Sequence, residues 1–478
     1  MDISLCMIVK NEEQFLGDCL RNLAPWVAER IVVDTGSTDA SPQIAQDCGA
    51  KLFSFPWNND FAAARNFSLG KASRPWVLVV DADEKLSSPD ARQLANLTEV
   101  QDQRGCQAFS FVQRNYVKGS GQISWNQSWK PNVSESEDGE GYSGYIDVPV
   151  VRLFPRDPQI LFAGCVHESV ENALAQSGIG IQPSGLVLHH YGQVRDRERM
   201  RSKKQMYLQL GLDKLKQESG SARAHFELGI QLQELQHYEE AISHFLAALQ
   251  SDESFVIADL YAGICFSKLG KYDEAANYLG RARRSLPDSP ELEVELGIIE
   301  LKTGDPQAAA ARFDAVLARH PGHVACLCYL GALRVHEANT QAGRSLLEKA
   351  IALDPEHADA WVNLGIAWSQ SSESERACQC FERALLLKPE DHEVVRLLAM
   401  TLAQAGQAMR AALLLEQAVN RHPGSELLRI YYAAALMAAG RQERALETYQ
   451  EIVQGGGRLG KMALAQIEKI RSRSCNAV

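Results

Sequence analysis

The first 195 residues carry a pattern of short apolar runs. The segments "DISLCMIV", "ERIVVDTG" and "PWVLVVDA" are rich in Val and Ile, and stretches such as "EEQFLGDCLRNLAPWV", with the spacing of helices, separate them. Buried strands that alternate with helices are typical of a parallel sheet covered by helices. Residues 1–195 are therefore predicted to form an α/β domain with a largely parallel sheet.

The rest of the chain repeats with a period of 34 residues. A small residue recurs once per period, a second small residue follows 12 positions later, and a bulky residue comes 4 positions after that. The first small residues are Gly229, Gly263, Gly297, Gly331, Gly365, Ala399 and Ala433. This spacing predicts two helices per unit that approach closely at the small residues and bury their apolar faces against neighbouring units.

The repeat resembles the tetratricopeptide repeat. Seven units fill residues 222–459, and together they are expected to form an all-α superhelix. Residues 196–221 are predicted to form a solvated linking helix, and residues 460–478 a capping helix and tail. The resemblance implies that a protein or peptide binds along the concave face. A bare spacer or a dimerisation arm is the alternative.

Composition narrows the range of partners. The 478 residues have a formal net charge of −11, which argues against nonspecific nucleic-acid binding by clustered Lys and Arg. No apolar run approaches the roughly 20 residues of a transmembrane helix. The N-terminal segment also lacks the basic stretch of a secretory signal. We expect a cytoplasmic protein with no nucleic-acid partner and no transmembrane segment.

A polar cluster follows each of the three predicted strands: "KNEE", "DTGSTD" and "DADE". Ligands of open α/β sheets bind beyond the carboxyl ends of the strands, so the clusters are expected to form one site. In the third cluster, Asp81 and Asp83 offer two carboxylates, which a hard cation such as Mg²⁺ or Mn²⁺ prefers. A strand that merely returns to water could end in the same way, so the pair is informative only together with its neighbours.

The neighbouring segments supply that context. "IVKNEEQFLGDCL", "IVVDTGSTDASPQIAQDCGAKLF" and "FPWNNDFAAARNFSLGKASRPWVLVVDADE" together resemble the nucleotide-sugar domain of the inverting family 2 glycosyltransferases, which has the GT-A fold. The resemblance covers about residues 1–195. Joined to a repeat array, it is similar to bacterial glycosyltransferases related to the sublancin S-glycosyltransferase, which modify peptides. It implies a nucleotide-sugar donor, most commonly a UDP sugar, and a divalent cation.

The resemblance assigns donor-binding roles residue by residue. Asp34 in "VVDTGSTD" matches the aspartate that contacts the uracil, although Thr35 stands where the family often has a second acid. Asp83 matches the residue that holds the metal at the diphosphate. Asp81 matches its partner near the ribose, and we also count it as a candidate metal ligand. Asn11, in the first cluster, is placed with the donor-binding residues.

Arg65 and Asn66 in "AAARN" fall where the family places residues on the diphosphate side. An arginine suits that role because its guanidinium meets phosphate oxygens with two parallel hydrogen bonds. A surface salt bridge is the alternative role for Arg65.

Two residues further along are candidates for the chemistry of transfer. An inverting transfer needs a base opposite the leaving group, and Glu168 in "CVHESVEN" has a plausible place for it, with helix capping as the alternative. The base would matter less for a thiol acceptor, which is already partly ionised. In "LVLHHYG", His190 is chosen over His189 as a ligand of the metal or diphosphate, because strand alternation sends the two side chains to opposite faces. A structural histidine is the alternative.

A long segment between Arg114 and Pro149 is rich in Gly, Ser and aromatic residues. Loops of such length are usually functional or disordered. We predict an acceptor-side lid in which Trp125, Trp129 and Tyr142 contact the acceptor, and a disordered insertion is the alternative.

These observations favour a metal-dependent inverting glycosyltransferase that moves a sugar from a nucleotide, predicted to be UDP, to a protein or peptide presented by the repeats. A second hypothesis makes the acceptor a glycan or a lipid-linked sugar of the cell envelope. A third is a non-enzymatic repeat scaffold with a degenerate transferase domain.

Overall fold

The structure is a computed structural model that describes residues 2–99, 107–117, 123–124, 127–132, 139, 141–192, 197–218 and 220–475. The chain divides into two compact units, Met1–Asp305 and Pro306–Val478. The first unit holds the α/β domain together with the first repeats, so the boundaries predicted near residues 195 and 222 stay predictions. Among the described helices, none combines the length and the apolar character that crossing a membrane requires.

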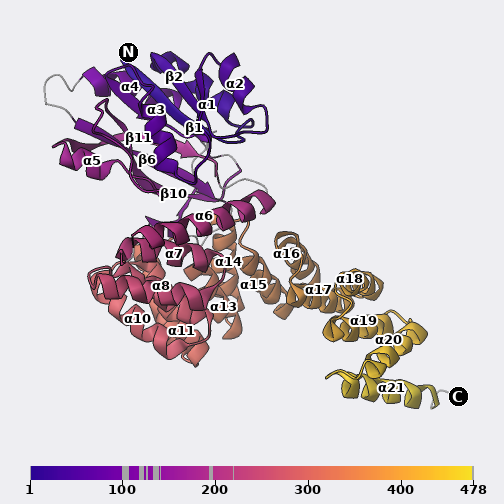
Figure 1. The fold of residues 1–478 in the computed structure, drawn as a ribbon. Coiled ribbons are helices and arrows are strands. Elements are labelled where there is room, and N and C mark those ends of the chain that lie inside the picture. The colour runs from indigo at the N-terminus through magenta and orange to yellow at the C-terminus, as the bar shows by residue number, and fades with distance from the viewer. Residues whose placement is uncertain are drawn as a thin grey trace. The chain divides into compact units, whose positions relative to one another are not determined.

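The α/β domain is built on one mixed sheet (Figure 1). Its strands are, in spatial order, β3 (Lys51–Ser54), β2 (Glu29–Asp34), β1 (Ile3–Val9), β4 (Trp76–Val79), β10 (Gly144–Pro155), β6 (Gln107–Val117), β11 (Gly180–His190) and β5 (Glu84–Leu86). A short strand, β9 (Lys130–Pro131), also pairs with β10, and β7 (Ile123–Ser124) forms a separate ribbon with β8 (Gln127–Ser128).

The first four strands along the chain form the parallel part that the sequence predicts. β1 lies between β2 and β4 and is parallel to both, and β3 is parallel to β2. The crossovers between them contain α1 (Leu16–Leu23), α2 (Ser41–Asp47) and α3 (Phe61–Leu69), as parallel pairing requires. The remaining strands make the sheet mixed, because β10 runs antiparallel to both β4 and β6, whereas β11 is parallel to β6 and antiparallel to β5.

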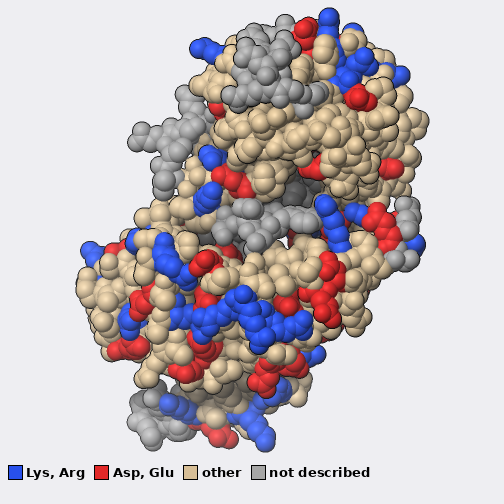
Figure 2. Space-filling model, turned by 90° about the vertical axis from the view of Figure 1, so that its left-hand side faces the viewer, with Lys and Arg blue, Asp and Glu red and all other residues tan. Residues whose placement is uncertain are grey.

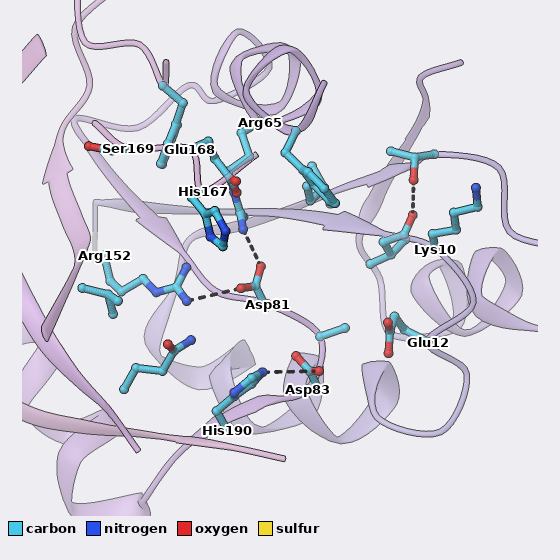
Figure 3. Close-up of a pocket in the computed structure, with 18 of the residues that line it drawn as sticks. Lys10, Glu12, Arg65, Asp81, Asp83, Arg152, His167, Glu168, Ser169 and His190 are labelled. Atoms are coloured by element: carbon cyan, nitrogen blue, oxygen red, sulfur yellow. Dashed lines mark hydrogen bonds and ion pairs between the residues drawn. The ribbon is translucent and has the colours of Figure 1, made fainter. Parts of the chain in front are cut away.

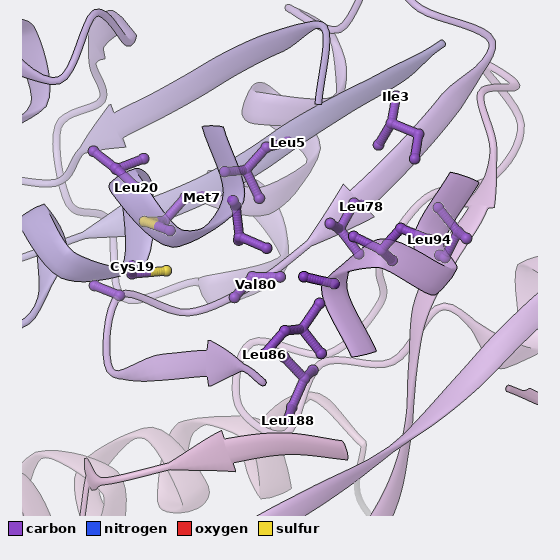
Figure 4. Packing of buried hydrophobic residues seen from close by; sticks show 14 of the residues in the cluster. Ile3, Leu5, Met7, Cys19, Leu20, Leu78, Val80, Leu86, Leu94 and Leu188 are labelled. Carbon is purple, nitrogen blue, oxygen red and sulfur yellow. The ribbon is translucent and has the colours of Figure 1, made fainter. Parts of the chain in front are cut away.

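Both faces of the parallel part are buried, which explains why its strands are continuous apolar runs. In β1, Leu5 and Met7 belong to a cluster on one face, and Cys6 belongs to a cluster on the other. The first cluster packs against α1 and α4 (Ser88–Glu99), from which Leu20 and Leu94 are buried (Figure 4). The second packs against α3 and α5 (Glu171–Gln176). The sheet is therefore held rigidly between helical layers, and its strand ends are fixed in position.

The linking helix α6 (Arg197–Gln217) forms where the sequence predicts a helix. It is not solvated throughout, because Leu210 is buried and the Lys214 ammonium makes a 2.8 Å ion pair with Glu227 of the first repeat. The side chains of Lys214 and Glu227 are 9% and 2% exposed, so this is an interior contact. The helix is thus packed against the repeats.

The repeats are helix pairs throughout. The first unit contains α7 (Ala222–Glu234), α8 (Tyr238–Ser251), α9 (Ile257–Lys268), α10 (Tyr272–Ser285) and α11 (Pro290–Thr303). The second contains α12 (Pro306–Arg319), α13 (Val324–His336), α14 (Thr340–Leu353), α15 (Ala358–Gln370), α16 (Ser374–Leu387), α17 (His392–Gln404), α18 (Ala408–Arg421), α19 (Glu426–Ala438), α20 (Gln442–Gln454) and α21 (Gly460–Cys475).

Small residues set the distance between the two helices of a repeat. A Cβ at Gly229 would lie 2.5 Å from the ring of Phe245, and one at Gly365 would lie 2.6 Å from the ring of Phe381. Each pair has the spacing that the sequence analysis identified. At the C-terminal end, Ile467 and Ile470 of α21 are buried in one cluster with residues of α19 and α20, as expected of a capping helix.

Charged side chains of both signs cover the face drawn in Figure 2. Lys and Arg form a band there that Asp and Glu border. Acidic residues therefore adjoin the basic band on this face, and the whole chain carries a net charge of −11. The absence of a nucleic-acid partner remains a prediction.

Two glycine substitutions should change stability in opposite directions. Gly229→Ala should lower the free energy of unfolding by about 1–3 kcal/mol, because the new methyl group overlaps the fully buried Phe245 ring. Gly280→Ala, at an exposed position of α10 with open space around it, should raise it by about 0.5–1 kcal/mol through helix propensity. Urea denaturation of both variants checks this, and a neutral Gly229→Ala would contradict the packing account.

Candidate active site

A cavity of about 740 Å³ opens at the carboxyl ends of the parallel strands. Its lining comes from the end of β1, from the segments after β1, β2 and β4, from β6, β10 and the end of β11, from α3, from the segments before α3 and α5, and from α6. The polar residues of the lining are Lys10, Asn11, Glu12, Thr35, Arg65, Asp81, Asp83, Gln113, Arg152, His167, Glu168, Ser169, Glu171, His190 and Tyr207. The three polar clusters of the sequence thus meet at one edge of the sheet, and each contributes at least one residue to the lining.

The acidic segment after β4 is a tight turn. The backbone N–H of Asp81 donates to the Glu84 carboxylate at 2.8 Å, and the backbone N–H of Glu84 donates to the Asp81 carbonyl at 3.0 Å. β5 then begins at Glu84 and pairs with His190 of β11. As a result Asp81 and Asp83 line the cavity, while the Glu84 side chain is fully buried beneath it.

Asp81 is held between two arginines (Figure 3). Nη2 of Arg65 lies 2.8 Å from one carboxylate oxygen of Asp81, and Nη2 of Arg152 lies 3.2 Å from the other. Burial alone would raise the pKa of Asp81, but the two guanidinium groups outweigh it and hold the pKa well below its usual value. Both oxygens of this carboxylate are therefore occupied by cations of the protein itself.

The same arginines connect Asp81 to two further acids. Nε of Arg65 lies 2.6 Å from Oε1 of Glu168, and Arg152 lies 2.5 Å from Oε1 of Glu84. Burial raises the pKa of Glu84, and Arg152 opposes that shift. Glu168 precedes α5, whose N-cap is Val170, so Glu168 is engaged in an ion pair and does not cap this helix. The alternative of a surface salt bridge for Arg65 does not fit a side chain that is 9% exposed.

Asp83 faces His190 across the lower part of the cavity in Figure 3. Nε2 of His190 lies 3.5 Å from Oδ2 of Asp83, and its Nδ1 lies 2.6 Å from Oδ1 of Asn115. Burial lowers the pKa of His190, but the Asp83 carboxylate outweighs it, so the pKa is raised above its usual value. A Cβ at Gly192 would lie 2.6 Å from both Asp83 and His190, so only glycine leaves these two groups unobstructed.

Strand alternation separates the two adjacent histidines as predicted. His190 lines the cavity. His189 is buried on the other face, where its Nδ1 lies 2.8 Å from the Tyr116 hydroxyl and its ring stacks on the Tyr116 ring.

The described residues contain no group of three or more His, Cys, Asp or Glu side chains arranged to hold a metal ion. Asp83 and His190 are two potential donors, whereas both oxygens of Asp81 are paired with arginines. Magnesium commonly uses only one or two protein carboxylates and takes its other ligands from phosphate and water. The residues present therefore fit a cation that takes two ligands from the protein and the others from elsewhere, and Asp83 and His190 are the residues that would hold it.

The predicted donor residues differ in their placement. Asn11 lines the cavity and has a φ of 58°, and its side-chain oxygen accepts from the Thr38 N–H at 2.7 Å. The Asp34 carboxylate accepts from the Gly36 and Ser37 N–H groups and thereby shapes the loop after β2. Thr35, not Asp34, is among the lining residues of the cavity.

Asn66 is turned away from the cavity lining. Its amide donates to the Phe162 carbonyl at 2.9 Å and accepts from the Phe162 N–H at 2.8 Å. This pair of bonds ties α3 to the loop before α5, a role that the sequence did not suggest.

Two of the aromatic residues predicted for the acceptor side, Trp129 and Tyr142, are not among the lining residues of the cavity. Trp129 lies against Gly144 of β10, and Tyr142 stacks on Tyr116 with ring centroids 5.1 Å apart. Trp125 lies outside the described residues. The aromatic residues of the cavity are Trp57, Phe61, Phe162 and Tyr207.

Sequence reasoning missed Arg152 and Tyr207. A signal existed for Arg152, because a charged residue inside the apolar strand "VVRLFP" must be paired if it is buried. The sequence contains no comparable signal for Tyr207, which lies on a helix rich in charged residues.

Removal of Arg152 should destabilise the domain. Arg152→Met should lower the free energy of unfolding by about 3–5 kcal/mol, because it removes the cation that pairs with the fully buried Glu84 carboxylate and leaves the partly buried Asp81 with Arg65 alone. Arg156→Met, at an exposed position just beyond β10, is the matched control and should change stability by less than about 0.5 kcal/mol. Adding Glu84→Gln to Arg152→Met should recover part of the loss in denaturant titrations. Equal stability of the two arginine variants would contradict the assigned network.

Comparison with known proteins agrees with this organisation. Residues 4–158 match the family described as Glycosyl transferase family 2. Residues 226–290, 266–324 and 294–337 match one tetratricopeptide-repeat model, and residues 330–455 match a second.

The curated relatives include a repeat protein and glycosyltransferases. A TPR repeat-containing protein of Synechococcus elongatus is 34% identical over 43% of this chain and 48% of its own length. The lipopolysaccharide core biosynthesis glycosyltransferase LpsC of Rhizobium meliloti is 30% identical over 30% of this chain and 53% of its own length. The SPbeta prophage-derived glycosyltransferase SunS of Bacillus subtilis is 24% identical over 53% of this chain and 54% of its own length.

This chain thus spans about half the length of the curated relatives that it matches. The family match covers the parallel half of the sheet and the three polar clusters and ends before Glu168 and His190, and the repeat matches cover helix pairs of the repeats. The chain therefore joins a domain of the family 2 glycosyl transferases to a series of tetratricopeptide repeats.

Proposed function

We propose that the protein is an inverting glycosyltransferase that moves a sugar from a UDP sugar to a side chain of a protein or peptide. One observation carries the proposal. Asp83 and His190 lie on one side of Asp81 and Glu168 lies on the other, all within one cavity (Figure 3). An inverting transfer needs this separation, because the acceptor attacks from the side opposite the departing diphosphate.

The donor diphosphate is assigned to the side of Asp83 and His190. These residues would hold a Mg²⁺ or Mn²⁺ ion, which when bound would stabilise the negative charge of the leaving diphosphate. Asp81 is not proposed as a direct ligand, because its carboxylate is paired with Arg65 and Arg152. It instead fixes the two guanidinium groups, in which Nη1 of Arg65 and Nε of Arg152 have no hydrogen-bond partner among the described residues. The nucleoside is assigned to Asn11, which lines the cavity, and to Asp34, which lies just outside the lining and shapes the loop after β2.

Glu168 is proposed as the base that takes the proton from the acceptor. Its carboxylate is 13% exposed and is oriented by the 2.6 Å contact with Arg65. Arg65 is thus a positioning residue, because it acts on the reaction by holding Glu168 and Asp81.

A glycan acceptor is the second candidate. It is favoured by the similarity to LpsC, whose name refers to the synthesis of the lipopolysaccharide core. The repeats favour a polypeptide instead, since arrays of this kind present extended binding surfaces.

A cytoplasmic location and the absence of a nucleic-acid partner belong to the same proposal.

Asp83→Asn should abolish the metal dependence of donor binding while the domain stays folded. The amide is a weaker ligand than the carboxylate for a hard cation. Calorimetric titration of UDP sugars with and without Mn²⁺ measures the effect, with Asp47→Asn, at an exposed position of α2, as the control. If donor affinity in the presence of Mn²⁺ were unchanged, Asp83 would not be a metal ligand.

Glu168→Gln should preserve donor binding and slow transfer to a hydroxyl by about 10²–10⁴-fold, because the amide accepts no proton. Glu171→Gln is a matched control, since Glu171 also lines the cavity but contacts Ser169 and Val170 of its own loop. Single-turnover assays with each variant give the rates. A fully active Glu168→Gln variant on a hydroxyl acceptor would remove Glu168 from the mechanism.

A further inference from the structure

An aromatic wall closes the side of the cavity that carries Glu168. Trp57 and Phe61 meet edge to face with ring centroids 4.8 Å apart, and Phe61 stacks on Tyr207 at 5.8 Å. The Tyr207 ring also lies 6.2 Å from the ring of His167, the residue before Glu168. Burial raises the pKa of Tyr207, and the Glu168 carboxylate adds to the shift. Tyr207 is therefore a neutral phenol close to the proposed base.

The wall is assembled from two parts of the chain. Trp57 and Phe61 belong to the α/β domain, where the Phe61 N–H donates to the Cys165 carbonyl at 3.0 Å. Tyr207 belongs to α6, which contributes Met206 as well to the cavity lining. Aromatic residues from both parts thus face one space, and the helix predicted as a linker supplies part of the cavity.

The same helix is fixed to the first repeat. Two turns beyond Tyr207, the buried Lys214 ammonium pairs with Glu227 of α7, and Arg223 pairs with the second oxygen of that carboxylate at 2.9 Å. At a rise of about 1.5 Å per residue, Tyr207 and Lys214 are about 10 Å apart along the helix. An extended peptide covers this distance with about three residues.

We propose that Tyr207, Phe61 and Trp57 form an acceptor subsite that holds a polypeptide next to Glu168. The inference rests on the proposed function and deepens it, since it locates the acceptor. A segment of the acceptor that lies on the first repeat needs only a few residues to bring its hydroxyl or thiol side chain to the wall. The aromatic rings supply apolar contact for the acceptor next to the proposed base.

The test compares Tyr207→Ala with Leu212→Ala on the same helix. Leu212 is 38% exposed and is not part of the cavity lining, so its variant controls for changes in α6. The probes are a panel of UDP sugars and a pool of short synthetic peptides, each with one Ser, Thr or Cys between randomised flanks. Donor affinity is measured by calorimetry, and the peptide KM and kcat are measured by transfer of labelled sugar.

Tyr207→Ala should raise the peptide KM about tenfold, the effect of losing roughly 1.4 kcal/mol of aromatic contact, and should leave donor affinity unchanged. Leu212→Ala should match the unmodified protein in both. Tyr207→Phe should show a smaller rise in KM, which separates the ring from the hydroxyl. Thermal unfolding of each variant establishes that it is folded.

Three outcomes would overturn the inference. An unchanged peptide KM in Tyr207→Ala would show that the wall does not contact the acceptor. A loss of donor affinity in the folded Tyr207→Ala variant would place the wall on the donor side. If the unmodified protein bound a UDP sugar but glycosylated no peptide and used a glycan instead, the polypeptide acceptor would be wrong. Failure of the unmodified protein to bind any UDP sugar would be distinguishable, because it would contradict the proposed function itself.

Discussion

Pairing of buried charge is the constraint on which the site depends. Asp81 and Glu84 leave the apolar strand β4 at a depth where an isolated carboxylate would be strongly destabilising. Arg152, from β10, pairs with both acids, and Arg65, from α3, pairs with Asp81. The network fixes three separate segments of the chain relative to one another, and it also fixes Glu168 through Arg65. The geometry of the cavity follows from this network.

A second constraint shapes the repeats, and it acts through volume. In several repeats a glycine on the first helix faces an aromatic or leucine side chain on the second, as Gly229 faces Phe245 and Gly263 faces Leu279. A repeat of this kind is stabilised by packing against adjacent repeats. Helix α6 contacts the first repeat through Lys214 and the α/β domain through Tyr207. The helix that joins the two parts in sequence is therefore a structural element of both.

Much of this organisation could be predicted, because it depends on local periodicity. The 34-residue spacing predicts the helix pairs. The polar cluster after the third predicted strand points to Asp83 as a site residue, and in the structure Asp83 lies next to His190. The residues that were missed or differently placed depend on contacts between distant segments. Arg152 is 71 positions from Asp81, and Asn66 is 96 positions from the Phe162 backbone that uses its amide. Neither contact can be predicted from the spacing of residues along the chain.

The central claim is that the cavity binds a nucleotide sugar through a cation held by Asp83 and His190. Its most direct test is calorimetric titration of the unmodified protein with UDP, GDP and a panel of UDP sugars, each with and without Mn²⁺. The account predicts binding of UDP and of at least one UDP sugar that depends on Mn²⁺, and weaker binding of GDP. Absence of binding to every nucleotide would contradict the account and would favour a repeat scaffold that carries an inactive transferase domain.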